Sequence, residues 1–179
     1  SFAIAAIFFF SSTFCVILLG DESGYELGDV QRTKLAAIEA EWHTEPAPAA
    51  FTLFGIPNQK EMRTDYAIKI PYVMGMIATR STDKEVTGLH DLMKEHEIRI
   101  RNGMVAYSEL TKLRAGDQSP ELLASFEKNQ KDLGYGLLLK KYTPNVVDAT
   151  EEHIKAATKD TIPNVAALFF SFRAMVASG

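Results

Sequence analysis

SFAIAAIFFFSSTFCVILLG, residues 1–20, contains no charged side chain. A helix needs about 20 consecutive apolar residues to cross a bilayer, so this stretch is long enough to be a membrane span. A secretory signal peptide would begin with a basic segment followed by an apolar core of about 7–15 residues. This stretch has no basic residue. A buried core helix is the other alternative, and we favour the membrane span.

VAALFFSFRAMVASG, residues 165–179, is a second apolar stretch, and Arg173 is its one charged residue. The long sequence between the two stretches is polar and charged, so the mean hydropathy of −0.05 averages two different kinds of segment. This pattern predicts an all-α fragment of a larger membrane protein. We expect a partial transmembrane helix over 1–20, a long and mainly helical extramembrane loop over 21–160, and the start of the next transmembrane helix over 161–179. Because both apolar ends enter the membrane from one loop, we expect them to lie side by side and antiparallel.

Composition excludes several function classes. The net charge of −4 gives no reason to expect a nucleic-acid partner. Cys15 is the single cysteine, so the chain forms no internal disulfide. The sequence has no glycine-rich phosphate loop, no CxxC and no HExxH motif. Its four histidines lie in the polar segment, where we expect solvated surface positions: His43, His90, His96 and His153.

Turn and capping signals divide the polar segment. Three glycines among acidic residues at 20–29 predict a turn, and Asp29 predicts the N-cap of a helix over 30–43. Two apolar runs around NQKEMRT predict a small β-hairpin near 51–71. Further helices are expected over 88–114, over 119–142 with an interruption at GYG, from Asp148 or Thr150 to 159, and from a first turn containing Pro163.

The expected helix over 30–43 carries two charges of interest. Lys34 and Glu39 are five positions apart, so they are rotated by about 140° around the axis and are poorly placed to pair with each other. They are able instead to offer a cation and a carboxylate to a ligand along the helix. The alternative is a solvated charged face.

The second apolar stretch offers two more candidates. Met175 is either a packing residue or an axial haem ligand, since methionine and histidine together ligate some haems. Arg173 is either a side chain that extends to the membrane surface or the partner of a haem propionate.

Five strings in the chain resemble one known family, subunit I of the cytochrome bd quinol oxidases. The resemblance covers the whole chain in order, and it is specific because the strings are long. They are GDESGYELGDVQRTKLAAIEAEWHTEPAPAAFTLFGIP (20–57), IPYVMGMIATRS (70–81), RIRNGM (99–104), DLGYGLLLKKYTPN (132–145) and FRAMVASG (172–179).

The resemblance implies a bacterial enzyme that oxidises membrane quinol and reduces dioxygen to water. Lys34 and Glu39 match the residues assigned to quinol binding and oxidation in the family's quinol-binding loop (Q-loop). Met175 matches the axial methionine of the low-spin haem b, and Arg173 matches the arginine beside that haem. Two polar positions match residues that line the quinol pocket, Asp21 and Arg80.

The resemblance also implies cofactors, partners and location. The intact subunit would hold a high-spin haem b and haem d besides the low-spin haem b on Met175. Its substrate would be ubiquinol or menaquinol, and its partners subunit II and the lipid bilayer. It would be a multi-pass protein of the bacterial cytoplasmic membrane with the loop on the periplasmic face. The fragment alone should be inactive, because no histidine of this chain lies in an apolar stretch to oppose Met175. The alternative is a non-catalytic, membrane-tethered helical module that binds a protein.

Overall fold

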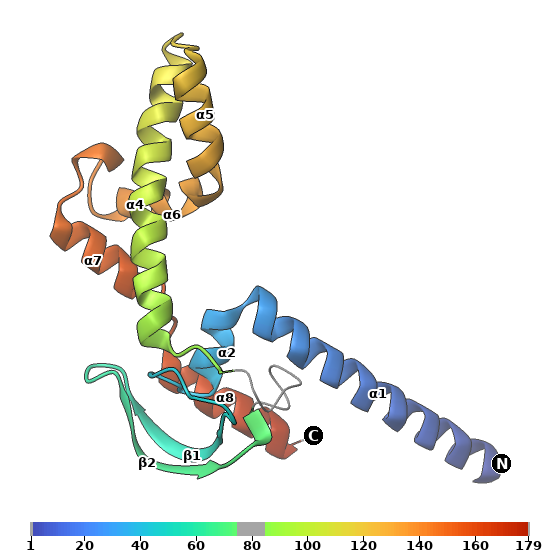
Figure 1. Cartoon of the computed structure of the whole chain (residues 1–179). Helices are drawn as coiled ribbons and strands as arrows, with labels where there is room; N and C mark the ends of the chain where they lie inside the picture. Colours follow the sequence, from blue (N-terminus) through green and yellow to red (C-terminus); the bar gives the residue numbers. More distant parts are fainter. Residues whose placement is uncertain (1, 75–84, 179) are drawn as a thin grey trace. The chain divides into compact units, whose positions relative to one another are not determined.

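The structure is a computed structural model that describes residues 2–74 and 85–178. Most of the described chain is helical, and the one sheet in these residues has two strands (Figure 1). The chain divides into two compact units, which are described separately. The first unit comprises Ser1–Leu89 and Asn164–Gly179, and the second comprises His90–Pro163.

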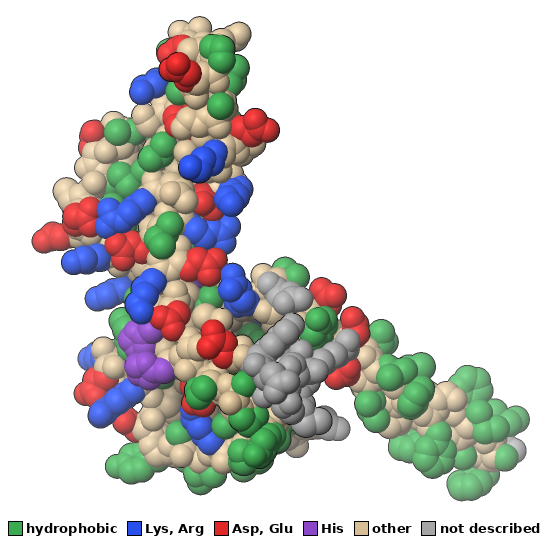
Figure 2. All heavy atoms as spheres, in the orientation of Figure 1, with side chains coloured by type: hydrophobic (Ala, Val, Ile, Leu, Met, Phe, Trp, Pro, Cys, Tyr) green, Lys and Arg blue, Asp and Glu red, His purple; other side chains and the backbone are tan. Residues whose placement is uncertain are grey.

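Helix α1 (Phe2–Val30) contains the first apolar stretch. Its segment Phe2–Gly28 is long and apolar enough to cross a membrane, and none of it is buried in this chain. Figure 2 shows hydrophobic side chains on the surface of the N-terminal part of this helix. This exposure disfavours the buried core helix. Because the large apolar side chains of α1 through Leu19 are exposed, the expected side-by-side contact with the second apolar stretch is not formed. Apolar helices have no hydrophobic reason to associate within lipid, so entry from a common loop does not require contact.

The predicted turn at 20–29 is wrong, because α1 continues through it to Val30. Asp29 lies inside that helix and is not an N-cap. A helical glycine costs about 1 kcal/mol relative to alanine. Packing offsets this cost, since Leu27 packs against a buried cluster formed by Leu35, Ala49, Met74 and Val86.

Helix α2 (Arg32–Ile38) follows a one-residue break at Gln31 and is shorter than the predicted helix over 30–43. Trp42, expected on that helix, is buried in the segment that follows it.

The predicted hairpin is confirmed. β1 (Phe51–Asn58) pairs with β2 (Arg63–Ile70) in antiparallel register, with irregularities between Thr52 and Ile56. Asn58 closes the connection, because its Oδ1 accepts hydrogen bonds from the backbone N–H groups of Lys60 and Glu61 at 3.2 and 3.1 Å.

Helix α8 (Val165–Ser178) contains the second apolar stretch and packs against α2 and β1. Asn164 caps it, since its Oδ1 accepts a hydrogen bond from the N–H of Ala167 at 3.0 Å. Pro163 therefore precedes the helix and does not lie in its first turn. Phe169 is fully buried and anchors α8 in the first unit. The stretch Glu151–Ser178, whose apolar part is α8, is the second candidate membrane span by length and composition.

The second unit is built on the long helix α4 (Leu89–Arg114), which agrees with the predicted helix over 88–114. The predicted helix over 119–142 is interrupted. It forms α5 (Pro120–Asn129), η1 (Gln130–Asp132), α6 (Leu133–Leu137) and η2 (Leu138–Lys141). The interruption does not fall at GYG, which lies inside α6.

The rest of the second unit is η3 (Val146–Asp148) and α7 (Glu151–Asp160). Thr150, not Asp148, caps α7 in a reciprocal capping box with His153. A buried cluster holds the unit together: Ile100, Leu139, Val146, Ile154 and Ala157.

One histidine departs from the expected surface position. His96 is buried, and its Nδ1 lies 2.7 Å from Oγ1 of Thr161. The hydrogen bond to Thr161 satisfies a polar group that burial would otherwise destabilise.

Candidate functional site

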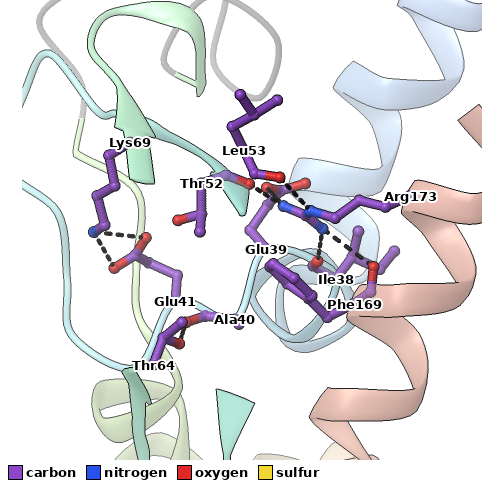
Figure 3. Close-up of polar contacts among 10 residues, drawn as sticks. All are labelled: Ile38, Glu39, Ala40, Glu41, Thr52, Leu53, Thr64, Lys69, Phe169 and Arg173. Atoms are coloured by element: carbon purple, nitrogen blue, oxygen red, sulfur yellow. Dashed lines mark hydrogen bonds and ion pairs between the residues drawn. The ribbon is translucent and has the colours of Figure 1, made fainter. Parts of the chain in front are cut away.

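Arg173 is the centre of a polar cluster in the first unit (Figure 3). Its guanidinium donates to backbone carbonyls on two other elements. Nη1 donates to Ile38 O, at the end of α2, at 2.9 Å, and Nε donates to Leu53 O, on β1, at 3.2 Å. Nη2 also donates to Thr52 O. Arg173 therefore joins α8 to both α2 and the hairpin.

The two remaining donors of Arg173 reach Phe169 and Glu39. Nη1 also donates to Phe169 O at 3.3 Å, and Nη2 donates to Oε2 of Glu39 at 3.1 Å. A guanidinium has five N–H groups. All of them are used by this chain, and the guanidinium carbon also lies 3.4 Å from the centroid of the Phe169 ring. A haem propionate would have to replace one of these acceptors.

The end of α2 fixes the position of Glu39. Glu39 is the C-cap residue, and Ala40 follows it with φ of 52°. The N–H of Glu41 bonds to Ala36 O at 2.8 Å, and that of Ala40 bonds to Ala37 O at 3.2 Å. This is a Schellman motif with alanine at a position that usually holds glycine.

Glu39 is a buried carboxylate, with 4% of its surface exposed. Burial raises its pKa above the usual value, and the charge and hydrogen bond of Arg173 only partly oppose that effect. A raised pKa makes a buried carboxylate a better proton acceptor than a solvated one.

Glu41 forms a second buried acidic site two residues further along. Its Oε1 and Oε2 accept from Nζ of Lys69 on β2 at 3.2 and 3.3 Å, and Lys69 also pairs with Glu45. Burial raises the pKa of Glu41 to about 7, and the neighbouring Glu45 adds to this while Lys69 opposes it. Figure 3 shows Glu39 directed at Arg173 and Glu41 directed at Lys69.

The other predicted site residues lie apart from this cluster. Lys34 is exposed on α2, whereas Glu39 is buried, so the two face different surroundings, as their spacing predicts. Asp21 is exposed on α1. Arg80 lies outside the described residues. Met175 is 60% exposed on α8, two residues after Arg173.

The chemistry of Met175 fits a haem ligand. Its thioether is a haem-ligand type, and it is exposed on an apolar helix, where another group is able to approach it.

Sequence reasoning missed the roles of Glu41, Lys69 and the hairpin carbonyls. Glu41 and Lys69 are 28 positions apart, and no local spacing relates them. The one sequence feature that pointed to a buried acidic site is the presence of three glutamates within 39–45.

Comparison with known proteins identifies relatives over the full chain. The family model described as cytochrome bd terminal oxidase subunit I matches residues 1–179. The chain is 42% identical over 179 residues to cytochrome bd-II ubiquinol oxidase subunit 1 of Escherichia coli (strain K12). The aligned region covers 100% of this chain and 35% of that protein. It is 31% identical over 97 residues to cytochrome bd ubiquinol oxidase subunit 1 of Bacillus subtilis (strain 168). That aligned region covers 54% of this chain and 21% of the Bacillus protein. The chain thus spans about a third of the length of the Escherichia coli relative.

Proposed function

Because this chain belongs to the cytochrome bd terminal oxidase subunit I family, we propose that it is the quinol-oxidising segment of a membrane terminal oxidase. The intact enzyme would oxidise ubiquinol or menaquinol and reduce dioxygen to water. The relatives are named ubiquinol oxidase subunits, which argues against a non-catalytic interaction module. In this proposal residues 21–160 form the Q-loop, while 1–20 and 161–179 belong to the flanking membrane helices.

One observation carries the proposal. Glu39, a buried carboxylate of raised pKa, is hydrogen-bonded to Arg173 on the helix that also carries Met175. Quinol oxidation releases protons together with electrons, so it needs a proton acceptor close to an electron acceptor. A contact between the loop and the helix of the proposed haem ligand meets that need.

The residues have separate roles in this scheme. Glu39 accepts a proton from the quinol hydroxyl, since its raised pKa suits reversible protonation. Lys34 is exposed on α2 and donates a hydrogen bond to a quinol oxygen, which stabilises the negative charge that develops there. Asp21 and Arg80 are proposed as further polar residues of the quinol pocket.

Met175 is proposed as a residue that would hold the low-spin haem b, and the bound haem would supply an electron acceptor for quinol. Arg173 holds Glu39 beside α8. The high-spin haem b, haem d and the contacts with subunit II belong to the parts of the intact oxidase beyond this chain. The loop is proposed to lie on the periplasmic face.

The test is steady-state quinol oxidation by the intact oxidase carrying Lys34→Ala or Glu39→Gln. Lys34→Ala should mainly raise KM, because a binding contact is lost. Glu39→Gln should lower kcat, because proton acceptance belongs to the transition state. Oxygen consumption with an artificial donor that reduces the haem directly should survive both changes.

Two variants serve as matched controls. Glu41→Gln alters a buried glutamate that faces Lys69, and Lys128→Ala removes an exposed lysine on α5. Both should retain quinol turnover. Normal quinol turnover in Lys34→Ala and Glu39→Gln would remove the basis for this site.

A further inference from the structure

The peptide that follows Glu39 is held from the second strand of the hairpin. Oγ1 of Thr64, on β2, donates a hydrogen bond to the carbonyl of Ala40 at 2.8 Å, as Figure 3 shows. Ala40 is 3% exposed, so this carbonyl is largely removed from water. Buried carbonyls are normally satisfied by a protein donor, and here the donor comes from 24 positions along the chain.

Ala40 depends on such contacts because its backbone conformation is unfavourable. Its φ is 52°, in the left-handed region where glycine is usual and a side chain is strained. The next carbonyl, that of Glu41, accepts from the N–H of Leu89 at 2.9 Å. The turn is therefore fixed by distant partners, and these partners set the direction in which the neighbouring Glu39 leaves the end of α2.

Gly55, on β1, is shaped to fit Thr64. It is buried, and a Cβ at this position would lie 2.6 Å from Cγ2 of Thr64. The next nearest atoms, in the backbone of Ala67 and Asp65, would lie at 3.6 and 3.7 Å, which is ordinary contact. The missing side chain thus leaves room for the methyl group of Thr64, and the place of the methyl group fixes the direction of the hydroxyl toward Ala40.

We propose that Thr64 is a positioning residue for Glu39. Through its hydrogen bond to Ala40 it keeps the Glu39 carboxylate in the orientation in which it meets Arg173 and receives the quinol proton. This inference rests on the proposed function and adds a residue that acts on the proton acceptor without touching quinol. Thr64, Ala40 and Gly55 all belong to the first unit, so the contact needs no segment beyond this chain.

The experiment measures kcat and KM for quinol in the intact oxidase, per assembled haem, with Thr64→Val and Thr64→Ser. Valine keeps the branched shape and loses the donor, whereas serine keeps the donor. Thr64→Val should lower kcat about fivefold and leave KM unchanged, which corresponds to about 1 kcal/mol, the usual contribution of one hydrogen bond. Thr64→Ser should keep a kcat close to that of the unmodified enzyme.

A double-mutant cycle separates positioning from a general structural role. If Thr64 acts through the Glu39 carboxylate, Thr64→Val should lower kcat no further in an enzyme that already carries Glu39→Gln. A merely structural role would lower kcat by the same factor in both backgrounds, and that result would overturn the inference.

Gly55→Ala provides a second route that does not depend on the valine variant assembling. The new Cβ should displace the methyl group of Thr64 and lower kcat. Combining it with Thr64→Ser should restore kcat, because serine has no Cγ2 to displace. Failure of serine to relieve Gly55→Ala would contradict the proposed packing.

Thr111→Val is the matched control. It also removes a threonine hydroxyl that donates to a backbone carbonyl, that of Tyr107 at 2.9 Å, but on α4 in the second unit. Its kcat should equal that of the unmodified enzyme, and a loss equal to that of Thr64→Val would overturn the inference.

The Glu39→Gln variant keeps this inference distinct from the proposed function. Normal turnover in Glu39→Gln would remove both. A slow Glu39→Gln together with full kcat in Thr64→Val would remove the positioning role alone and leave Glu39 as the proton acceptor.

Discussion

Nη2 of Arg173 lies 3.1 Å from Oε2 of Glu39, across 134 positions of sequence. This hydrogen bond joins the end of α2 to α8. The same guanidinium binds the carbonyls of Ile38 and Leu53, so the cation satisfies the C-terminal end of one helix and an irregular strand together. The buried carboxylate of Glu39 is thereby held against Arg173, which lies two residues before Met175 on α8.

Glu39→Ala should destabilise the first unit more than Glu39→Gln. Alanine leaves the largely buried Arg173 without its anionic partner, and breaking a buried pair in this way costs about 3–5 kcal/mol. Glutamine retains a carbonyl acceptor for Nη2. Hydrogen exchange of the backbone amides at Ala40 and Glu41 in the intact subunit measures the difference. Equal protection in the two variants would contradict a structural role for the ion pair.

Met175→Leu should abolish or shift the low-spin haem b signal while changing stability little. Leucine is close to methionine in volume, and such substitutions usually cost less than about 1.5 kcal/mol. Met175 is also 60% exposed in this chain, so few packing contacts are lost. The reduced-minus-oxidised spectrum of the intact oxidase gives the result. Val176→Leu, with similar exposure of 61%, is the control and should leave the spectrum unaltered.

Glu41 should make the first unit less stable as the pH rises. The pKa of Glu41 is raised from 4.5 to about 7, mainly by burial, so the folded state holds a proton that the unfolded state has already lost between these values. Stability therefore falls from about pH 4.5 to about pH 7 and is constant above, by at most about 3 kcal/mol. Lys69 and Glu45 are the charged groups facing Glu41.

Glu41→Gln should remove the part of this pH dependence that is due to Glu41 and leave the part of the same sign that is due to Glu39. Thermal unfolding at several pH values measures the change. Glu61→Gln, at an exposed position of the hairpin turn, is the control. A variant with the same pH profile as the unmodified protein would show that Glu41 is not the titrating group.

Gly103→Ala should destabilise the second unit. A Cβ at Gly103 would lie 2.4 Å from the backbone N of Gly136, so α4 and α6 would have to separate. We expect a loss of about 1–3 kcal/mol from overpacking. Gly134→Ala is the matched control, because its Cβ would meet no atom within 4 Å. That substitution should stabilise α6 by about 0.5–1 kcal/mol. Hydrogen exchange in α4 reports both effects, and equal effects of the two substitutions would contradict the close approach.

The sequence by itself determined the features that depend on local patterns. The two long apolar runs form α1 and α8. Such runs are recognisable in sequence because an apolar helix is stabilised by any apolar surroundings and does not depend on one particular contact. Alternating and turn-forming residues give the hairpin, and Ser119 followed by Pro120 marks the start of α5. Long family-specific strings identified the family, which the match over residues 1–179 confirms.

Only the tertiary structure decided which charged residues are buried and what they contact. Helix α1 continues through 20–29 despite three glycines because Leu27 packs against a buried cluster that includes residues distant in sequence. No local sequence pattern predicts that contact. Lys34 and Glu39 look alike as helix-surface charges, yet one is exposed and the other is buried against Arg173. Burial and ion pairing depend on which distant segments share a volume, so the raised pKa of Glu39 follows from packing across the fold and not from its neighbours in sequence.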